Sequence, residues 1–587
     1  MKKIVISAIV SSALMLSVTG CGDNNSKSNA TVTKQEKKVS IEDRKKAFNK
    51  KIESYKEYGF DINQTSPKSY LLTVKEPKKS VELFLKIFSL NLSVDESDKQ
   101  DLEKLLDGSR FSVDVDWDKY VSNQKDSVEV NALGKDSDVS SDPIAKMLQE
   151  KKVGAYLTYN GNDELKKIDF KDIDDVLKNG NEKAHIKLSN AFVDVEKAPT
   201  SNSTQRKYTI NGGEFNIEFT DELNTTTSMG YKNLKCDIDK SNAYLGEQEC
   251  KIPTISISMD KGSKEQIDIT MSDTEYSYKA VSKNNKVNED LSFSIKAIDT
   301  NNNMHLKGLK FSGLFANMDE AVIKEYMTIL ESPSKDNKKD MAKLLSLAGK
   351  MYQNGVTLKY DTAVDSIDIN SDEINFALSG YSGHGEGALD KNINYDEKSV
   401  IKSLVISDAT NKNNKFEVDN FRFGYGISDM YNFIPKMMDI LSVASTETNT
   451  TKIDNVVQKD GLETAQKLVN QGFGIHIKPL GMDKAYFSDR GDSISVGKSD
   501  FELDVRLLQN QVKVDINNPM MPMMLLSYLK ADGKLVIPIK DLQTLSKRPE
   551  FAMLGMLMMM AKIEGENAVF VLKYENGKLL VNNQPVM

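Results

Sequence analysis

The fold of this 587-residue chain is decided by the stretch that contains Ile255-Ser-Ile-Ser-Met259, Ile267-Asp-Ile-Thr-Met271 and Leu291-Ser-Phe-Ser-Ile295. Each run alternates apolar with polar residues, and Met304–Phe311 continues the pattern. Short polar turns such as Asp299-Thr-Asn-Asn-Asn303 separate the runs. Runs of period two joined by short turns predict an antiparallel meander with one buried and one wet face.

Helical patterns lie on both sides of this stretch. Ser40 and Asp43 form a capping box, and the apolar residues that follow share one helical face. These apolar residues are Ile41, Phe48, Ile52 and Tyr55. Further helices are predicted from Pro77 onward, over Asn317–Leu330 and over Asp336–Tyr352. The predicted class is α+β, with extended curled antiparallel β-sheets and helices packed on one side.

A helix that stops at a glycine and leads into an alternating strand recurs along the chain. Glycine tolerates positive φ, which makes it the favoured helix terminator. Four junctions show the pattern: Leu105–Gly108, Leu177–Gly180, Tyr352–Gly355 and Leu468–Gly472. A further pair is Ile144–Leu148, which resembles Met341–Leu345. We interpret them as repeated helix-Gly-strand units. The alternative is that any α+β chain yields such junctions by chance.

The N-terminus carries the three parts of an export signal. Two lysines follow Met1, the run Ile4–Val18 is apolar or small and uncharged, and Val18-Thr-Gly-Cys21 ends it. The run is shorter than the roughly 20 apolar residues of a membrane span. It therefore predicts a signal peptide closing on a lipobox, with cleavage before Cys21 and acylation of Cys21, for example with palmitate. The alternative is an ordinary signal peptide with an incidental cysteine.

The size of the chain predicts about two to four domains. Residues 22–39 hold almost nothing to bury and predict a disordered tether. The predicted regions are a signal peptide (1–20), the lipidated tether (21–39), an N-terminal α+β region (40–140), a first β-rich repeat region (141–335) and a second with Met-rich helices (336–587).

Two cysteines remain once Cys21 is acylated. Cys236 and Cys250 flank a turn-rich segment and form an even pair in an oxidising compartment. We predict a disulfide between them, and two free thiols or a metal pair are the alternatives.

Little in the sequence indicates catalysis or a cofactor. The net charge of −8 is mild for this length and argues against a nucleic-acid binder, which would concentrate basic residues on one face. The glycine-rich stretch Gly380–Gly387 has the wrong spacing for a nucleophile elbow or a phosphate loop, so we predict a mobile hairpin loop. The four histidines stand singly, which favours surface or structural roles over metal binding: His185, His305, His384 and His476. No catalytic residue, metal site or cofactor is predicted.

Methionine is concentrated in Met520–Met524 and Met553–Met560. Thioethers bind Cu(I), and flexible methionines also line surfaces that accept varied apolar partners. Neighbouring leucines favour a third interpretation, in which these methionines fill the core of helices.

The C-terminal run Val569–Pro585 resembles the close of the YdgA-like (DUF945) family of uncharacterised bacterial envelope proteins. The resemblance is carried by Tyr574, Gly577, Leu579, Asn582 and Pro585. The segment Leu468–Leu480 is similar to that family's helix-glycine-strand element. The resemblance implies a membrane-attached protein that faces the periplasm, with no catalytic residues to carry over. The lipobox departs from the family, which more often has an uncleaved N-terminal helix.

These observations lead to one expected function and one alternative. We expect a non-enzymatic bacterial envelope lipoprotein, facing the periplasm, that binds lipid or another apolar envelope ligand in a sheet-lined groove. The alternative is a scaffold or assembly lipoprotein that binds a protein partner. Gly22 stands where an aspartate would resemble an inner-membrane retention signal, which favours the outer membrane.

Overall fold

The computed structural model describes residues 40–88, 96–134, 150, 152–161, 163–179, 181–197, 205–242, 244–263, 265–301, 303–331, 337–447, 450–489, 491–515, 518–548, 551 and 553–586. The export signal, Cys21 and Ile144–Leu148 lie outside these residues. The chain forms two compact units, unit 1 up to Lys279 and unit 2 from Ala280. The division falls within β13 (Ile267–Lys283), inside the predicted region 141–335.

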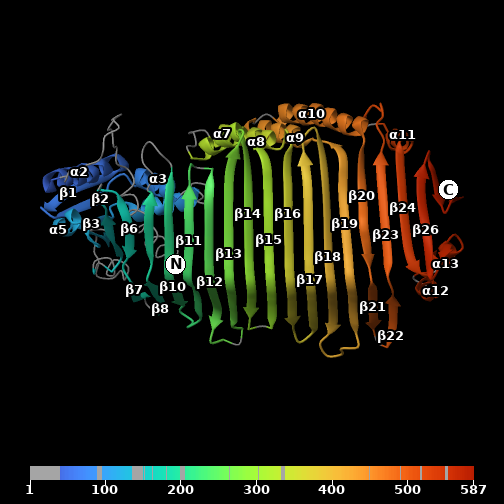
Figure 1. The fold of residues 1–587 in the computed structure, drawn as a ribbon, viewed down its shortest axis with the longest axis horizontal. Coiled ribbons are helices and arrows are strands. Elements are labelled where there is room, and N and C mark those ends of the chain that lie inside the picture. Colours follow the sequence, from blue (N-terminus) through green and yellow to red (C-terminus); the bar gives the residue numbers. More distant parts are fainter. Residues whose placement is uncertain are drawn as a thin grey trace, which may run out of the picture. The chain divides into compact units, whose positions relative to one another are not determined.

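Unit 1 is an antiparallel sheet with helices near its N-terminal end (Figure 1). Its helices are α2 (Ile41–Glu53), the 3-10 turn η1 (Ser54–Tyr58), α3 (Pro77–Phe88), α4 (Glu96–Leu106) and α5 (Trp117–Val121). Its strands are β1 (Phe60–Ser66), β2 (Ser69–Val74), β3 (Arg110–Val115), β4 (Val128–Gly134), β5 (Gly154–Tyr159), β6 (Leu165–Phe170), β7 (Ile173–Asn179), β8 (Glu182–Ser189), β9 (Phe192–Lys197), β10 (Arg206–Thr220), β11 (Thr226–Lys240) and β12 (Gly246–Lys261).

Unit 2 begins with a meander in which each long strand pairs antiparallel with the next. Its strands are β14 (Lys286–Thr300), β15 (Met304–Asp319), β16 (Val356–Asn370), β17 (Ile374–Leu389), β18 (Asn392–Asp408), β19 (Lys415–Tyr431), β20 (Phe473–Met482), β21 (Lys484–Asp489), β22 (Asp492–Val496), β23 (Ser499–Leu507), β24 (Leu529–Pro538), β25 (Lys562–Glu564), β26 (Asn567–Glu575), β27 (Lys578–Val581) and β28 (Gln584–Pro585). Its helices are α7 (Glu320–Glu331), α8 (Asn337–Met351), α9 (Ile434–Thr446), α10 (Thr450–Gln471), α11 (Met521–Leu526), α12 (Ile539–Ser546) and α13 (Met553–Met558).

The helices α7–α10 lie across one end of the long strands of unit 2 (Figure 1). Asn432, which precedes α9, donates hydrogen bonds to the carbonyls of Tyr352 and Asp390 at the ends of neighbouring elements. Gln471, the last residue of α10, donates to Asn392 at the start of β18. The prediction placed helices along one side of the sheet. In unit 2 these four helices instead cover strand ends and leave most of the strand length free of them.

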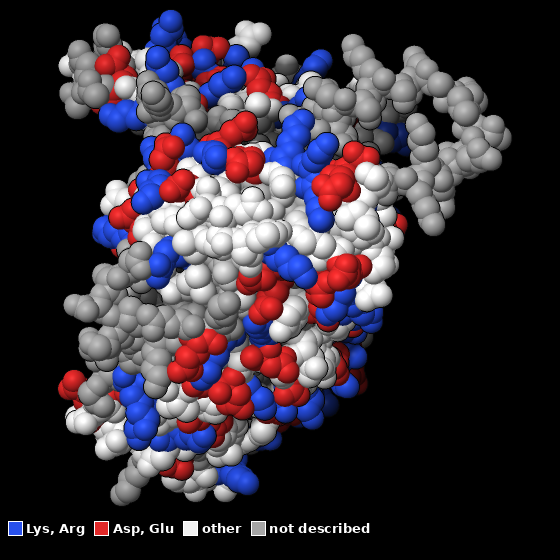
Figure 2. All heavy atoms as spheres, turned by 90° about the vertical axis from the view of Figure 1, so that its left-hand side faces the viewer, with Lys and Arg blue, Asp and Glu red and all other residues white. Residues whose placement is uncertain are grey.

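The surface drawn in Figure 2 carries lysine and arginine side chains interspersed with aspartate and glutamate. An uncharged band separates some of these charges, and neither sign forms a continuous patch on this face. No helix of the described residues is long and apolar enough to cross a membrane.

The core of unit 1 confirms most of the predicted N-terminal helix. The Ser40 hydroxyl accepts a hydrogen bond from the Asp43 amide, as the capping box predicts. Phe48 is buried and packs edge-on against Trp117 and Tyr120. Ile41, by contrast, is 52% exposed, so its predicted place in the core is wrong. As the first residue of α2, it precedes the buried residues of the helix, which begin with Arg44.

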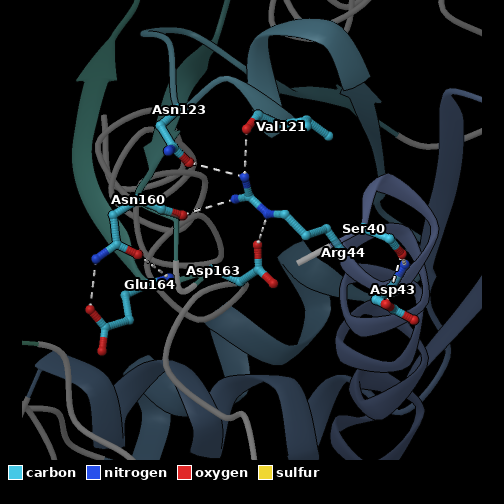
Figure 3. A network of polar contacts seen from close by, with 8 residues as sticks. All are labelled: Ser40, Asp43, Arg44, Val121, Asn123, Asn160, Asp163 and Glu164. Atoms are coloured by element: carbon cyan, nitrogen blue, oxygen red, sulfur yellow. Dashed lines mark hydrogen bonds and ion pairs between the residues drawn. The ribbon is translucent and has the colours of Figure 1, made fainter. Parts of the chain in front are cut away.

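A buried arginine joins α2 to two loops of unit 1 (Figure 3). The Arg44 side chain is only 4% exposed. Its guanidinium donates hydrogen bonds to the Asp163 carboxylate (2.7 Å), the Val121 carbonyl (2.9 Å), the Asn123 side chain (3.0 Å) and the Asn160 carbonyl (2.9 Å). The planar fork of arginine suits such a set of acceptors, because its five N–H groups point in fixed directions.

Cys236 and Cys250 lie directly opposite each other on β11 and β12, and their sulfurs form a disulfide. The turn-rich segment between them is the connection of this hairpin, with Ser241 and Asn242 bonded to the Leu245 carbonyl. The bond therefore links two strands that are already neighbours.

We expect the double change Cys236→Ser and Cys250→Ser to lower the free energy of unfolding of unit 1 by about 3 kcal/mol, because the bond closes a loop of about 15 residues. Trp117 is the only tryptophan and lies in the unit 1 core, so its fluorescence during urea unfolding reports on this unit. The reduced wild-type protein should match the double variant. Equal stability of the oxidised and double-variant proteins would contradict the prediction.

The predicted class, α+β with antiparallel sheets, is confirmed, whereas the repeated helix-Gly-strand units are not. Gly108, Gly355 and Gly472 do follow helices at positive φ and precede strands. Leu177, however, lies in strand β7, so the helix predicted there is wrong. The Asn179-Gly180 pair is also a strong hairpin signal, and Asn179 pairs with Glu182 on β8.

The predicted helix over Asn317–Leu330 begins later than expected. Asn317 belongs to β15 and has a φ of 65°, and α7 starts at Glu320. The Asp319 side chain accepts hydrogen bonds from the Ala321 and Val322 amides and thus caps the start of this helix.

Candidate binding site on the sheet of unit 2

One face of the unit 2 sheet carries apolar side chains in register from strand to strand. Directly opposite residues of neighbouring strands point to the same face. A first row consists of Met304, Ile369, Phe376, Ile406, Phe416, Phe487 and Ile494. A second row consists of Ile298, Leu306, Ile367, Leu378, Leu404, Val418, Ala485 and Val496. We call the face that bears these rows the apolar face.

The apolar face is not sealed. Phe416 is 38% and Phe487 is 48% exposed, although the two rings lie opposite each other on β19 and β21. Val418 is the only member of the two rows that is buried. Paired aromatic side chains at this exposure form a contiguous apolar surface, which is typical of a binding site.

A line of positive-φ residues keeps this face apolar along the full length of the strands. On β17 the apolar spacing changes from two to three between Leu378 and Tyr381, which would move the later residues to the other face of a regular strand. Gly380 lies within this step and has a φ of 63°. Gly308 on β15 and Asn420 on β19 have φ values of 66° and 50° at the corresponding positions. Such residues act like bulges, after which the alternation restarts.

The glycine-rich stretch of β17 makes room for aromatic side chains from its neighbours. A Cβ atom at Gly385 would lie 2.3 Å from the ring of Tyr360 on β16, and one at Gly387 would lie 3.2 Å from Tyr395 on β18. The prediction of a mobile hairpin loop at Gly380–Gly387 is therefore wrong, because the stretch lies inside β17. Glycine within a strand also marks a close approach by another group.

Three tyrosines and a glutamate meet over this glycine strand. The Tyr360 and Tyr395 hydroxyl oxygens lie 2.7 Å apart across β17. The hydroxyls of Tyr395 and Tyr425 both donate to Oε2 of Glu397, at 2.7 and 2.8 Å. Glu397 lies opposite Gly385 and Tyr425 in the sheet register and thus shares the face of the tyrosines. We call these four residues the tyrosine–glutamate cluster.

The tyrosine hydroxyls keep Glu397 ionised. Partial burial acts to raise the pKa of Glu397, but hydrogen bonds from Tyr395, Tyr360 and Tyr425 outweigh it and hold that pKa below its ordinary value. Burial first, and then hydrogen bonding, raises the pKa of Tyr395 above its ordinary range. At neutral pH the cluster is therefore a carboxylate surrounded by neutral phenols.

Among the described residues, Glu397 differs from Glu417 of the neighbouring strand in having no basic partner. Glu417 on the opposite face lies 2.7 Å from Lys415 and 3.3 Å from Lys484. Among the described residues, no lysine, arginine or histidine forms an ion pair with Glu397. The cluster thus places a negative charge that has no basic partner on a mostly apolar surface.

The histidines do not contribute to this face. Each has an aspartate oxygen at 2.7 Å: His185 with Asp174, His305 with Asp299, His384 with Asp361 and His476 with Asp396. The unit 2 histidines alternate with residues of the apolar face and therefore point to the opposite one. Within the described part of the chain, no group of three or more His, Cys, Asp or Glu residues could hold a metal ion.

The two methionine-rich segments are only partly buried. Met520, Met523 and Met524, at the start of and within α11, are 45–63% exposed, so the prediction that they fill a core is wrong for these residues. In the second segment Met558 and Met560 pack against the small C-terminal core, whereas Met559 between them is 80% exposed. The exposed group remains compatible with a partner surface or with Cu(I) binding, and both stay predictions.

The architecture defines a protein of long antiparallel strands with a partly exposed apolar sheet face. Residues 158–358 match the family described as "Bacterial protein of unknown function (DUF945)", and the predicted DUF945 relationship is confirmed over this segment. The match does not include Leu468–Leu480 or Val569–Pro585, which carried the resemblance in the sequence. No curated protein and no solved structure matches this chain.

Proposed function

We propose that the protein is a non-enzymatic, lipid-anchored bacterial envelope protein whose periplasmic part binds the hydrocarbon of a lipid along the apolar face of unit 2. The observation that carries the proposal is the pair of apolar rows, in which Phe416 and Phe487 stay 38% and 48% exposed. A site of this kind needs no catalytic group.

Hydrocarbon fits the apolar face by both chemistry and length. Neighbouring strands lie about 4.8 Å apart, so a row across seven strands is about 29 Å long and accommodates an extended acyl chain. Each buried methylene of such a chain contributes about 0.8 kcal/mol. The line through Gly308, Gly380 and Asn420 extends the apolar surface along the strands as well as across them.

The anchor and location rest on the sequence. The lipobox that ends at Cys21 supports an acylated N-terminus, and residues 22–39 supply a tether between lipid and unit 1. Gly22 favours the outer over the inner membrane. An acylated protein attached in this way would present its sheet to lipids near the membrane surface.

Native mass spectrometry tests the proposal. The mature chain from Gly22 onward is exported behind a cleavable signal, so that only the acylated cysteine is missing, and co-purified lipid is extracted and identified. We expect a stoichiometric lipid adduct. A protein mass without adduct, together with no binding of added alkyl probes, would rule out hydrocarbon binding.

Substitution of the exposed Phe416 ring should weaken lipid binding. We expect Phe416→Ser to reduce lipid affinity roughly tenfold or more, because it removes an apolar contact worth about 1.5–3 kcal/mol when buried. Val400→Ser is the matched control, since Val400 lies on the opposite face of β18 and is also half-buried. Equal losses in the two variants would contradict binding at the apolar face.

A second candidate function is attachment to a protein partner, and the exposed apolar residues of α9 and α11 favour it. Met437 and Leu441 on α9 are 41% and 44% exposed, and Met523 on α11 is 63% exposed. A photocrosslinking residue at position 523 should then capture a protein in intact cells. One at Val400 should not, and equal capture at both would argue against this surface.

A further inference from the structure

The tyrosine–glutamate cluster has the composition of a cation site. The Tyr395 and Tyr425 ring centroids lie 5.8 Å apart, and those of Phe423 and Tyr425 lie 5.7 Å apart. Aromatic faces attract cations through their quadrupole, and grouped rings recognise ammonium groups in particular. Glu397 adds a full negative charge within this group of rings.

The charge of Glu397 has not been matched by the protein itself. A carboxylate on a partly desolvated apolar surface is costly unless a counter-charge or hydrogen bonds compensate it. The Tyr395 and Tyr425 hydroxyls supply hydrogen bonds but no positive charge. A bound cation would therefore complete the site, whereas Glu417 on the opposite face already has Lys415 and Lys484.

The cluster is also continuous with the apolar rows. Along β19, Tyr425 is followed on the same face by Phe423 and Phe421 and, beyond Asn420, by Val418 and Phe416. The strand rises about 3.3 Å per residue, so the path from Tyr425 to Phe416 is about 30 Å long. A ligand with a cationic head at the cluster could thus lay its hydrocarbon along this stripe.

We propose that the tyrosine–glutamate cluster binds the ammonium headgroup of an amphiphile whose hydrocarbon lies along the apolar face, and that this amphiphile is a membrane lipid with an amine-bearing headgroup. The inference rests on the proposed function and adds the class of headgroup that the site selects. Glu397 supplies the counter-charge, and the rings of Tyr395 and Tyr425 enclose the cation. The glycines of β17 keep the space that the rings of Tyr360 and Tyr395 occupy.

Calorimetric titration of the mature chain from Gly22 onward tests the inference with two alkyl probes below their micelle concentrations. Decyltrimethylammonium carries the cation, and decyl maltoside carries the same hydrocarbon without charge. We expect the cationic probe to bind at least about tenfold more tightly. In Glu397→Gln this preference should fall to less than about twofold, while the affinity for decyl maltoside stays unchanged.

Glu417→Gln is the matched control, because it removes a carboxylate from the opposite face of the neighbouring strand. It should keep the full preference for the cationic probe. Tyr425→Phe retains the ring but removes one hydrogen bond to Glu397, and it should retain more of the preference than Tyr425→Leu, which removes the ring. Comparing Tyr425→Phe with Tyr425→Leu separates cation recognition by the ring from a purely structural role of the tyrosine. Circular dichroism of each variant would detect a change in structure.

The outcomes separate the two proposals. Equal binding of both probes, or an unchanged preference in Glu397→Gln, would overturn the ammonium site and leave hydrocarbon binding intact. Binding of neither probe would overturn both proposals. Lipid extracted from wild type should be richer in amine-bearing phospholipid than lipid from Glu397→Gln, and equal composition would exclude that lipid class as the selected ligand.

Discussion

Replacing Arg44 by alanine is expected to lower the free energy of unfolding of unit 1 by about 3–5 kcal/mol. The Arg44 side chain is 4% exposed and pairs with Asp163 at 2.7 Å. Its removal leaves the Asp163 carboxylate without its buried partner and takes one hydrogen-bond donor each from the Val121 and Asn160 carbonyls. Losing one member of a buried ion pair costs far more than losing an exposed pair.

Urea unfolding followed through Trp117 fluorescence measures this loss, because Trp117 packs against Phe48 of the same helix as Arg44. Arg44→Lys should fall between wild type and alanine, since lysine keeps the charge but cannot reach all four acceptors. Lys45→Ala is the matched control, because Lys45 pairs with an exposed Glu42 at 3.3 Å and should cost less than about 1 kcal/mol. Similar losses for Arg44→Ala and Lys45→Ala would show that the buried network adds little.

The parts of the fold that the sequence predicts well are those whose cause is local. The Ser40 capping box, the helix from Pro77 and the helix-ending Gly355 depend on residues within one turn of each other. The strands after Ile255 are also predictable from their own sequence, because apolar residues recur at every second position along each of them.

The errors arise where the deciding partner is distant in sequence. The glycines around Gly385 suggest a loop in the sequence, but Gly385 is required within the strand because the Tyr360 ring of the neighbouring strand packs over it. Leu177 precedes an Asn-Gly pair that suits a helix end and a hairpin alike, and only pairing with β8 decides between them. The role of Arg44 depends on Asn123 and Asp163, which lie far along the chain.

The candidate site was missed for a similar reason, although a signal was present. Glu397 is one of 86 acidic residues, and nothing near it in sequence marks it as special. The step in apolar spacing, however, recurs in successive strands, from Leu378 to Tyr381 and from Ile401 to Leu404. Aligning these steps would have revealed one continuous apolar face and shown that Glu397 interrupts it.

Replacing Gly213 by alanine is expected to destabilise unit 1 by about 4 kcal/mol or more, a loss reserved for severe backbone conflicts. Gly213 has a φ of 55° and lies where β10 changes partner from β9 to β8. A Cβ atom there would lie 1.9 Å from the Ser189 carbonyl oxygen and 2.7 Å from the Asn190 backbone. Both contacts are with main-chain atoms, so no side-chain rotation relieves them.

Gly262→Ala separates the conformational strain of a positive φ from the collision with neighbouring main-chain atoms. Gly262 also has positive φ, at 90°, but a Cβ atom there meets nothing within 4 Å. This control should cost only the conformational strain of about 1–2 kcal/mol, and the difference between the variants measures the collision at Ser189. Urea unfolding followed through Trp117 reports both, because Ile217 on β10 belongs to the same core. If Gly213→Ala cost no more than Gly262→Ala, the β8–β9 connection would have to move away readily, and the partner change of β10 would not depend on a glycine.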